Sequence, residues 1–278
     1  MLNEMMHRPV VMQELVDFMR SGQLPFAGAL GEIEAYANSR GIPIVPHETA
    51  KFIDFFCATL APRDILEIGT AIGFSASLMA QHLALEGHLT TIDRYPIMFE
   101  RAKENFDKMG LSDRITMLEG DASDVLPSLS GAYDLIFMDS AKAKYLEFYP
   151  HCMRLLKDGG VLIIDDVFQA GTIFDPLKTR PKRVRKIHRK LNELMAAILT
   201  DTQHRSCLVP LGDGLLMVRK QGEFDVQAFY QQFPVDTYTE QADFAERMAV
   251  FGRQERERVQ AEVQAAVASL TDFAESKD

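Results

Sequence analysis

The sequence predicts an α/β fold with a mostly parallel, doubly wound sheet that ends in an antiparallel hairpin. Short and nearly continuous apolar strands alternate with helix-like segments between residues 47 and 199, which is typical of a parallel sheet covered on both faces. Two further apolar runs, SCLVPL and GLLMVRK, are separated by Gly212-Asp213-Gly214. This spacing predicts a hairpin at the end of the sheet.

Apolar residues at helical spacing predict two N-terminal helices, and the alternating pattern then gives the elements of the core. We expect helices over about 9–20, 25–40, 47–60, 73–86, 96–109, 142–156 and 181–199. The strands before the hairpin are expected at 64–68, 88–93, 133–139 and 160–166, with a further strand and its turn at 115–122. Five strand-helix units closed by a hairpin give seven strands.

Three parts of the chain differ in character. Residues 1–46 are predicted to be an N-terminal helical segment, 47–220 a core domain, and 221–278 a helical extension of net charge −7. In the extension, 224–233 and 240–273 show helical patterns, and we expect them to pack on the body or on a second subunit.

Composition describes an ordinary globular chain of 278 residues, 47% hydrophobic and 25% charged. No stretch resembles a membrane span, and the N-terminus lacks the basic start and apolar core of a signal peptide. We therefore expect a cytoplasmic protein. Its three cysteines are few and scattered, which argues against a disulfide framework and a thiolate metal site.

The stretch DILEIGTAIGFS, residues 64–75, predicts a strand, a tight glycine turn and the start of a helix. Glycines at Gly69 and Gly73 would let a ligand approach the backbone closely. Glu67, two residues before the first glycine, would repel a phosphate but suit a cationic ligand, and S-adenosylmethionine (SAM) has a sulfonium and an amino group. An ordinary turn in another α/β enzyme is the alternative.

Acids or Gly-Asp turns follow all five parallel strands, where open α/β sheets bind ligands. Asp93 is placed to bind ribose hydroxyls, as the corresponding acid is in nucleotide-binding folds. Asp121 and Ala122 begin the turn after the third strand, where an adenine edge could be read. Ser75 could bind the ligand carboxylate or cap its own helix.

Two neighbouring strand ends carry Asp139, Asp165 and Asp166. Like charges at such range are costly unless a cation lies among them, and oxygen ligands select a hard ion such as Mg²⁺. Such an ion would hold a hydroxyl substrate and lower its pKa. Lys142 could act as a base or stabilise the developing oxyanion, or could face solvent; one of the adjacent Asp165 and Asp166 could also point away.

The chain resembles the cation-dependent class I SAM O-methyltransferases of the catechol and caffeoyl-CoA type, which have a Rossmann-like fold. LEIGTAIGFS, TID, EGDA, FMDSAKAKY, IIDDV and GDGLLMVRK carry the resemblance, over about residues 41–220. It implies that cofactor contacts come from Val45, Ser75, Asp93, Asp121, Ala122 and Asp139, and Mg²⁺ ligands from Asp139, Asp165 and Asp166. The family usually has Asp-Asn where this chain has Asp165-Asp166, so the site would gain a negative charge.

Within this family, IEAYANSRGIPIV, EIGTAIG and a PKR-rich segment are similar to the bacterial tRNA 5-hydroxyuridine methyltransferases. These make 5-methoxyuridine at the wobble position. The net charge is −10, yet KTRPKRVRKIHRK, residues 178–190, holds eight Lys or Arg, so the remainder carries about −18. Such a segment could bind the phosphates of an anticodon loop or be a solvated helix face. The expected RNA contacts are Lys182, Arg183, Arg185, Lys186 and Arg189, with Lys178, Arg180 and Lys190 beside them.

The main prediction is therefore a SAM- and Mg²⁺-dependent methyltransferase of tRNA wobble 5-hydroxyuridine, and we expect a homodimer. The first alternative is an O-methyltransferase of a small catechol-like phenol, which needs only a shallow pocket. A nicotinamide-dependent oxidoreductase on a similar sheet and a non-catalytic RNA-binding or scaffolding protein are the others. The glycine turn disfavours the oxidoreductase, because it reads ExGxxxG, with Glu67 two residues before Gly69, where the dinucleotide motif is GxGxxG.

Overall fold

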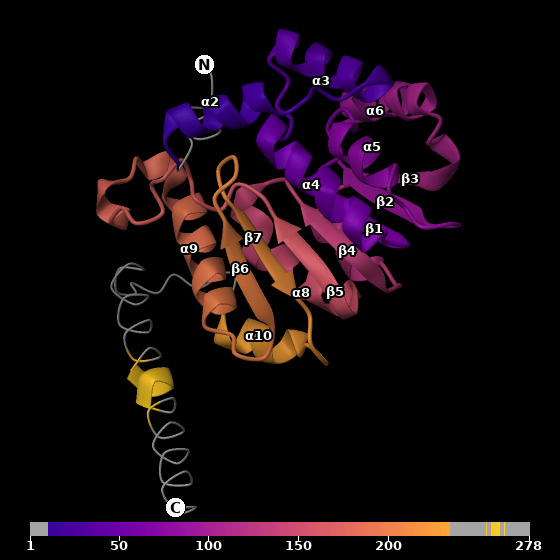
Figure 1. The fold of residues 1–278 in the computed structure, drawn as a ribbon. Coiled ribbons are helices and arrows are strands. Elements are labelled where there is room, and N and C mark those ends of the chain that lie inside the picture. The colour runs from indigo at the N-terminus through magenta and orange to yellow at the C-terminus, as the bar shows by residue number, and fades with distance from the viewer. Residues whose placement is uncertain (1–10, 234–253, 255–256, 262–263, 265–278) are drawn as a thin grey trace, which may run out of the picture.

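A seven-stranded sheet in the order β3-β2-β1-β4-β5-β7-β6 forms the centre of the protein (Figure 1). The structure is a computed structural model and describes residues 11–233, 254, 257–261 and 264. Strands β1 to β5 pair in parallel, and β7 runs antiparallel to β5 and β6. The strands are β1 Asp64–Ile68, β2 His88–Asp93, β3 Ile115–Glu119, β4 Tyr133–Met138, β5 Leu156–Ile164, β6 Arg205–Val209 and β7 Leu215–Arg219. The predicted fold class is confirmed.

The chain reverses its direction of travel across the sheet between β1 and β4, since β2 and β3 lie on one side and β5 on the other. Open α/β sheets bind ligands in the crevice at such a point, beyond the carboxyl ends of the strands. Two backbone hydrogen bonds bring three strand ends together there: Gly69 N donates to Ile92 O at 2.9 Å, and Asp139 N donates to Ile68 O at 3.0 Å.

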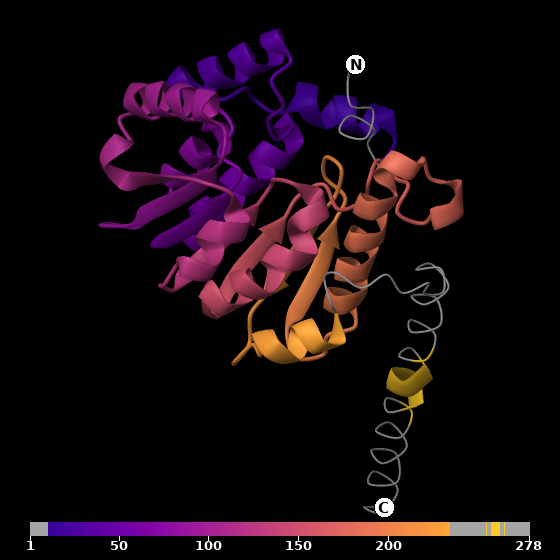
Figure 2. The same cartoon turned by 180° about the vertical axis from the view of Figure 1, so that it is seen from behind.

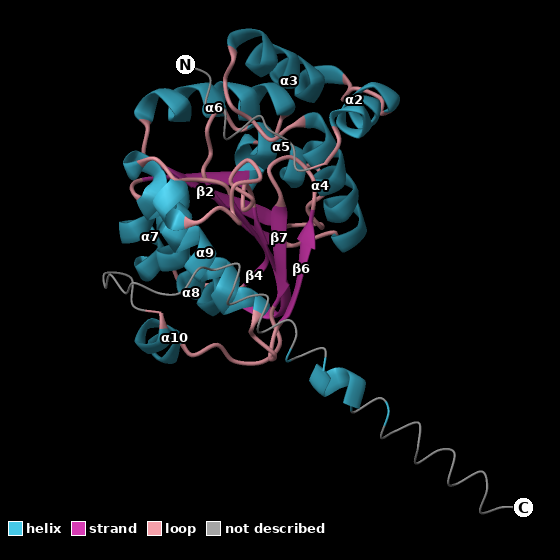
Figure 3. Ribbon diagram, turned by 90° about the vertical axis from the view of Figure 1, so that its left-hand side faces the viewer, coloured by secondary structure: helices cyan, strands magenta, loops and turns pink. Residues whose placement is uncertain are grey.

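Helices cover both faces of the sheet, so that it lies between two layers (Figure 3). One layer holds α3 Gly28–Arg40, α4 His47–Leu60, α5 Phe74–Ala80 and α6 Pro96–Met109, and α2 Gln13–Gly22 packs against α4. The other holds α7 Ala122–Ser128, α8 Tyr145–Leu155, α9 Arg185–Leu199 and α10 Val226–Gln232. Short 3₁₀ helices are η1 Ser112–Arg114, η2 Lys142–Lys144, η3 Leu177–Thr179 and η4 Lys182–Val184.

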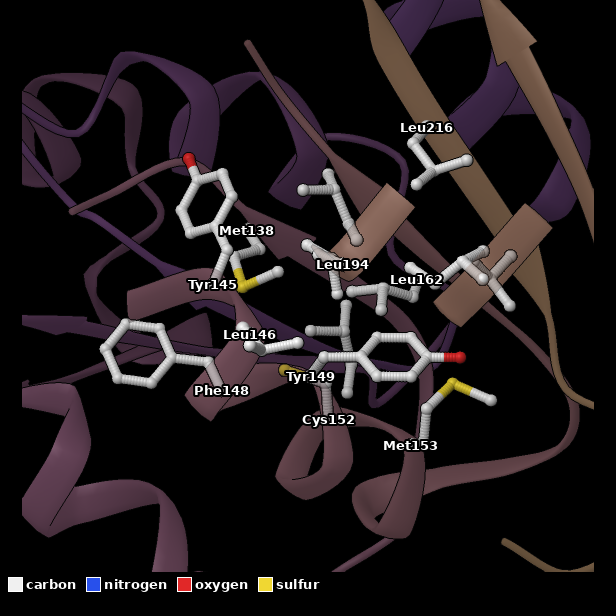
Figure 4. Packing of buried hydrophobic residues seen from close by; sticks show 14 of the residues in the cluster. Met138, Tyr145, Leu146, Phe148, Tyr149, Cys152, Met153, Leu162, Leu194 and Leu216 are labelled. Carbon is white, nitrogen blue, oxygen red and sulfur yellow. The ribbon is translucent and has the colours of Figure 1, made fainter. Parts of the chain in front are cut away.

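Each layer has its own apolar core against the sheet. On the α8 side, Tyr145 and Tyr149 are fully buried among Met138 of β4, Leu162 of β5 and Leu194 of α9 (Figure 4). Figure 2 shows this side, on which α8 and α9 lie next to each other. Phe229 of α10 joins the same cluster, and Leu30 and Ile33 of α3 join the cluster on the opposite face.

The element boundaries differ from the prediction in several places. Helix α9 begins at Arg185 rather than 181, because 182–184 form the 3₁₀ turn η4. Strand β5 begins at Leu156 rather than 160, because Leu156 already pairs with Tyr133 of β4. Gly159, with a positive φ, lies in the irregular stretch between Leu156 and Val161. Helix α5 ends at Ala80 rather than 86, and α7 was not predicted.

The predicted helix over 224–233 corresponds to α10. The predicted helix over 240–273 lies outside the described residues, apart from 254, 257–261 and 264. None of the helices in the described part of the chain is long and apolar enough to cross a membrane.

Candidate functional site

Two positions of the turn after β1 require glycine. Gly69 has a φ of 110°, and a Cβ added there would lie 1.9 Å from the carbonyl oxygen of Asp139. Gly73 has a φ of 78°, and its Cβ would lie 2.6 Å from the ring of Phe106. The first glycine therefore lets the end of β4 approach the turn, and the second lets α5 begin against α6.

Glu67 is completely buried beneath this turn and does not line the cavity described below. Its two carboxylate oxygens accept hydrogen bonds from the hydroxyls of Ser75 and Thr91, both at 2.6 Å. Burial raises the pKa of Glu67 to about 8. The Glu67 side chain therefore fixes Ser75 at the start of α5, and Ser75 bonds Glu67 instead of capping its helix.

Because the pKa of Glu67 is raised, the free energy of unfolding should depend on pH through this residue. In the folded protein the Glu67 carboxyl keeps its proton up to about pH 8, whereas the ordinary pKa of a glutamate carboxyl is 4.5. As pH rises between these values the unfolded chain ionises first, so this group costs about 1.4 kcal/mol of stability for each unit of difference. We expect Glu67→Gln to gain stability relative to the wild type between pH 5 and pH 9.

Urea unfolding at pH 5, 7 and 9 measures this gain, with Glu119→Gln as the control, because Glu119 is an exposed acid on β3. If the stability difference between Glu67→Gln and the wild type stays constant across this range, Glu67 is not a protonated buried carboxyl.

A cavity of about 390 Å³ lies beyond the carboxyl ends of β1, β2, β3 and β4. Of the eight residues predicted to contact the cofactor, only Glu67 does not line this cavity. The seven that line it are Val45, Gly69, Ser75, Asp93, Asp121, Ala122 and Asp139. The sequence pattern did not single out the side chains that give the cavity much of its apolar wall. These include Ile44, Phe74, Tyr95, Met98 and Phe148.

Backbone hydrogen bonds hold the two acids on the β2 and β3 side of the cavity. The Asp93 carboxylate accepts from Ala71 N at 2.9 Å and from Tyr95 N at 3.0 Å. Asp121 caps α7 by accepting from Ser123 N at 2.9 Å, a bond that lowers its pKa. Both carboxylates are thus fixed where a ligand in the cavity would meet them.

The second group of acids lies beyond β4 and β5. Asp139 lines the cavity, and Asp165 and Asp166 follow the end of β5. Burial and the nearby Asp166 raise the pKa of Asp139 to about 7, and burial followed by the charges of Asp166 and Asp139 raises that of Asp165. The structure therefore brings the three predicted carboxylates together, and their charges repel one another.

Lys142 supplies the positive charge of this acid group. Its ammonium is 2.5 Å from an Asp166 oxygen, and both side chains are mostly buried. Burial lowers the pKa of Lys142, but the carboxylates of Asp166, Asp139 and Asp213 together raise it by more, and the net effect is a raised pKa. Of the roles that the sequence left open, the ion pair favours an electrostatic one over that of a base, because the lysine holds its proton.

The donor chemistry of this group fits a hard divalent cation, since Asp139, Asp165 and Asp166 offer only carboxylate oxygens that repel one another. Among the residues that the structure describes, no three His, Cys, Asp or Glu side chains are already arranged around a common metal position. A cation there would compete with the Lys142 ammonium for Asp166.

Two residues beside the acid group were not predicted from the sequence as site residues. Asp213, in the turn between β6 and β7, is buried, and the charges of Asp166 and Lys142 act on it. Tyr145 is buried at the start of α8, and its hydroxyl accepts a hydrogen bond from Ser140 N at 3.0 Å. In the sequence, Asp213 stands out only as an acid between two glycines, and this pattern predicts a hairpin turn but no role in a site.

The basic segment follows the acid group but does not form one charged face. Its exposed members are Lys178, Lys182, Arg183 and Lys186. The side chain of Arg185 is partly buried and donates to the carbonyls of Arg180 and Lys178, and Arg189 lies 3.8 Å from Glu193. Of the five predicted RNA contacts, Lys182, Arg183 and Lys186 are thus presented to solvent.

Comparison with known proteins finds one family that spans most of the chain, a family of O-methyltransferases whose model matches residues 31–221. A catechol O-methyltransferase of Niastella koreensis is 32% identical over 151 residues, which cover 53% of this chain and 68% of that protein. Caffeoyl-CoA O-methyltransferase 1 of Eucalyptus globulus is 26% identical over 179 residues, covering 62% of this chain and 73% of that protein.

Solved structures share the fold. An SAH-bound methyltransferase of Podospora anserina superposes with a TM-score of 0.67 at 25% identity and covers 76% of this chain and 97% of its own. The O-methyltransferase TomG of Streptomyces achromogenes, solved in complex with SAM, superposes with a TM-score of 0.64 at 23% identity, over 76% of this chain and all of its own.

Proposed function

The chain belongs to the family of SAM-dependent O-methyltransferases, and on this premise we propose that it methylates a hydroxyl of a small catechol-like phenol at a divalent cation. Family membership decides against the nicotinamide-dependent oxidoreductase and the non-catalytic scaffold. The names of the relatives given above favour a phenolic acceptor over RNA, which the sequence alone had placed first.

The single observation that carries the proposal is the position of Asp139. This carboxylate lines the cavity of the predicted cofactor contacts and also belongs to the acid group with Asp165 and Asp166. A methyl donor in the cavity and a hydroxyl acceptor over the acid group would therefore meet at Asp139. Methyl transfer requires such a meeting of donor and acceptor.

The donor half of the proposed site is the cavity. Asp93 would bind the ribose hydroxyls of SAM, and Asp121 with Ala122 would contact the adenine, while the turn at Gly69 lets the methionine part approach the backbone. Ser75, fixed by Glu67, would bind the carboxylate of the methionine part. The apolar wall would shield the sulfonium from water.

In the acceptor half, Asp139, Asp165 and Asp166 would hold a divalent cation. When bound, such a cation orients a hydroxyl substrate and lowers its pKa. The acceptor oxygen attacks the methyl carbon in line, so that an O–C bond forms while the S–C bond breaks and its electron pair returns to sulfur. Lys142, as an ammonium, stabilises the negative charge on the acceptor oxygen, and the hydroxyl proton leaves to solvent or buffer.

A second acceptor has one specific observation in its favour. The basic segment follows the acid pair, Asp165 and Asp166, and four of its side chains are exposed: Lys178, Lys182, Arg183 and Lys186. They could contact the phosphates of an anticodon loop. Wobble 5-hydroxyuridine of tRNA is therefore retained as the alternative substrate.

Incubation with methyl-labelled SAM and Mg²⁺ distinguishes the two acceptors, when catechol and 5-hydroxyuridine-containing tRNA are supplied in parallel. We expect label in the phenol, and none when a chelator replaces Mg²⁺. Label in tRNA alone would reverse the assignment of the substrate, and full transfer in chelator would remove the cation from the proposal.

The triple variant Lys182→Gln, Arg183→Gln, Lys186→Gln tests the RNA alternative separately. If tRNA is the substrate, its affinity falls and the dependence of log K on log salt flattens by about one unit for each phosphate that the variant no longer neutralises. A charge-matched control is Arg63→Gln, Lys103→Gln, Arg205→Gln, made at exposed positions elsewhere. If tRNA binding responds equally to both triples, the basic segment is not an RNA site.

A further inference from the structure

The turn that carries Asp165 and Asp166 is held in a conformation that its own sequence disfavours. Asp166, Gln169 and Ala170 all have φ between 54° and 60°, the left-handed region that residues with a Cβ seldom adopt. No glycine lies among residues 165–170 to ease this conformation. The surrounding structure must therefore supply the contacts that hold the acid pair in place.

One set of contacts comes from α9. The Gln169 side chain is buried and lies 2.9 Å from His188 Nδ1, and it donates to Asn192 Oδ1 at 3.2 Å. This fixes the turn against α9, the helix that begins within the basic segment. It does not reach the carboxylates themselves, because the bonded atoms lie on the side chain three residues beyond Asp166.

The other set comes from the turn between β6 and β7. Asp213 Oδ1 accepts a hydrogen bond from Ala170 N at 2.6 Å, and the Asp213 carbonyl accepts one from Phe168 N at 2.9 Å. Gly214 has no room for a side chain, since a Cβ there would lie 2.0 Å from the Phe168 ring. Asp213 therefore clamps the acid-bearing turn by both its backbone and its side chain.

The second carboxylate oxygen of Asp213 is not used by this clamp. Asp213 is only 3% exposed, and its Oδ2 is buried without a hydrogen-bond partner within the described part of the chain. A buried carboxylate oxygen without a donor is costly unless a positive charge compensates it. The charged groups that act on Asp213 are Asp166 and Lys142, the ion pair of the acid group.

We propose that Asp213 is a fourth carboxylate of the acid group: Oδ1 positions the turn that carries Asp165 and Asp166, and Oδ2 adds its negative charge to the cation site. Asp213 is a positioning residue, and it acts through the acid pair and through the local field. The inference rests on the proposed function, in that a divalent cation binds at Asp139, Asp165 and Asp166. The Asp213 carboxylate would then attract that cation.

Substitution with asparagine separates the charge from the clamp. Asp213→Asn keeps an oxygen that can accept from Ala170 N but removes the charge, whereas Asp213→Ala removes both. We expect Asp213→Asn to melt close to the wild type and to bind Mn²⁺ about ten- to a hundredfold more weakly, the effect typical of groups behind metal ligands. Asp213→Ala should also melt at a lower temperature.

Calorimetric titration of the full chain with Mn²⁺ alone, without substrate or SAM, gives the affinity, and thermal melting reports the clamp. Asp158→Asn is the control, because Asp158 is an exposed acid that also accepts one backbone N–H, from Gly222 at 2.8 Å. We expect it to bind Mn²⁺ as the wild type does. If Asp213→Asn fails to fold, Asp213→Ser, which also removes the charge but keeps a hydroxyl, decides in its place.

The outcomes distinguish this inference from the proposed function. Wild-type affinity in Asp213→Asn, together with a measurable wild-type site, would overturn the role of Asp213 and leave the cation site intact. Absence of Mn²⁺ binding by the wild-type protein would overturn both. A loss in Asp213→Asn that Asp158→Asn does not share supports the fourth carboxylate.

Discussion

Replacement of Gly69 by alanine is expected to lower the free energy of unfolding by roughly 3 to 5 kcal/mol and to abolish SAM binding. The methyl group would meet the Asp139 carbonyl at 1.9 Å, and the φ of 110° is itself unfavourable for alanine. This clash can be relieved only if the turn and the end of β4 separate, and that movement displaces Asp139 from the cavity. Urea unfolding and calorimetric titration with SAM measure the two effects.

Gly110→Ala is the matched control for this substitution. Gly110 also has a positive φ, 66°, but a Cβ there would meet nothing within 4 Å. We expect a loss of about 1 kcal/mol from backbone strain alone, with SAM affinity unchanged. Equal losses of stability in the two variants would mean that backbone conformation, and not the approach of Asp139, makes Gly69 necessary.

Lys142→Met is expected to lower the rate of methyl transfer by roughly a hundred- to a thousandfold, the effect of removing a group that stabilises charge in the transition state. Lys142 does not line the donor cavity, so SAM affinity should remain within a factor of about two, a change worth less than about 0.5 kcal/mol. Single-turnover rates and SAM titration measure these quantities. Mn²⁺ should bind the variant more tightly, because the Lys142 ammonium no longer competes for Asp166.

Lys142→Arg decides between the two chemical roles of the lysine. Arginine keeps the positive charge but does not give up its proton in proteins. If Lys142 acts through its charge, the arginine variant recovers part of the activity that Lys142→Met lacks. If the arginine variant is as inactive as the methionine variant while both bind SAM normally, Lys142 accepts the hydroxyl proton.

The strands and their order could be predicted because each is a short apolar run bounded by turn residues. The errors occurred where local signals are ambiguous. Lys157-Asp158-Gly159-Gly160 has the composition of a turn, yet it lies within β5 as an irregular stretch between Leu156 and Val161, which both pair with β4. Gly159 N and Gly160 O also exchange backbone hydrogen bonds with Lys220. Helix α7 has only seven residues and contains Pro127, so it lacks the length that makes a helical pattern visible.

That seven of the expected cofactor contacts line one cavity could be predicted because most of these residues follow strand ends, and the sheet brings strand ends together. The interactions between side chains could not. That Ser75 bonds Glu67, and that Lys142 pairs with Asp166, depend on rotamers and burial that no spacing specifies. The basic segment shows the same limit, because Arg185 binds carbonyls of its own segment instead of facing solvent.

The ion pair between Lys142 and Asp166 also bears on how the protein can be handled. The chain carries its own counter-ion for the acid group, so the charge of the buried carboxylates is partly balanced within the fold itself. Purification in the presence of a chelator should consequently yield folded protein. The apo form is then a convenient starting material for metal reconstitution and for spectroscopy with paramagnetic ions.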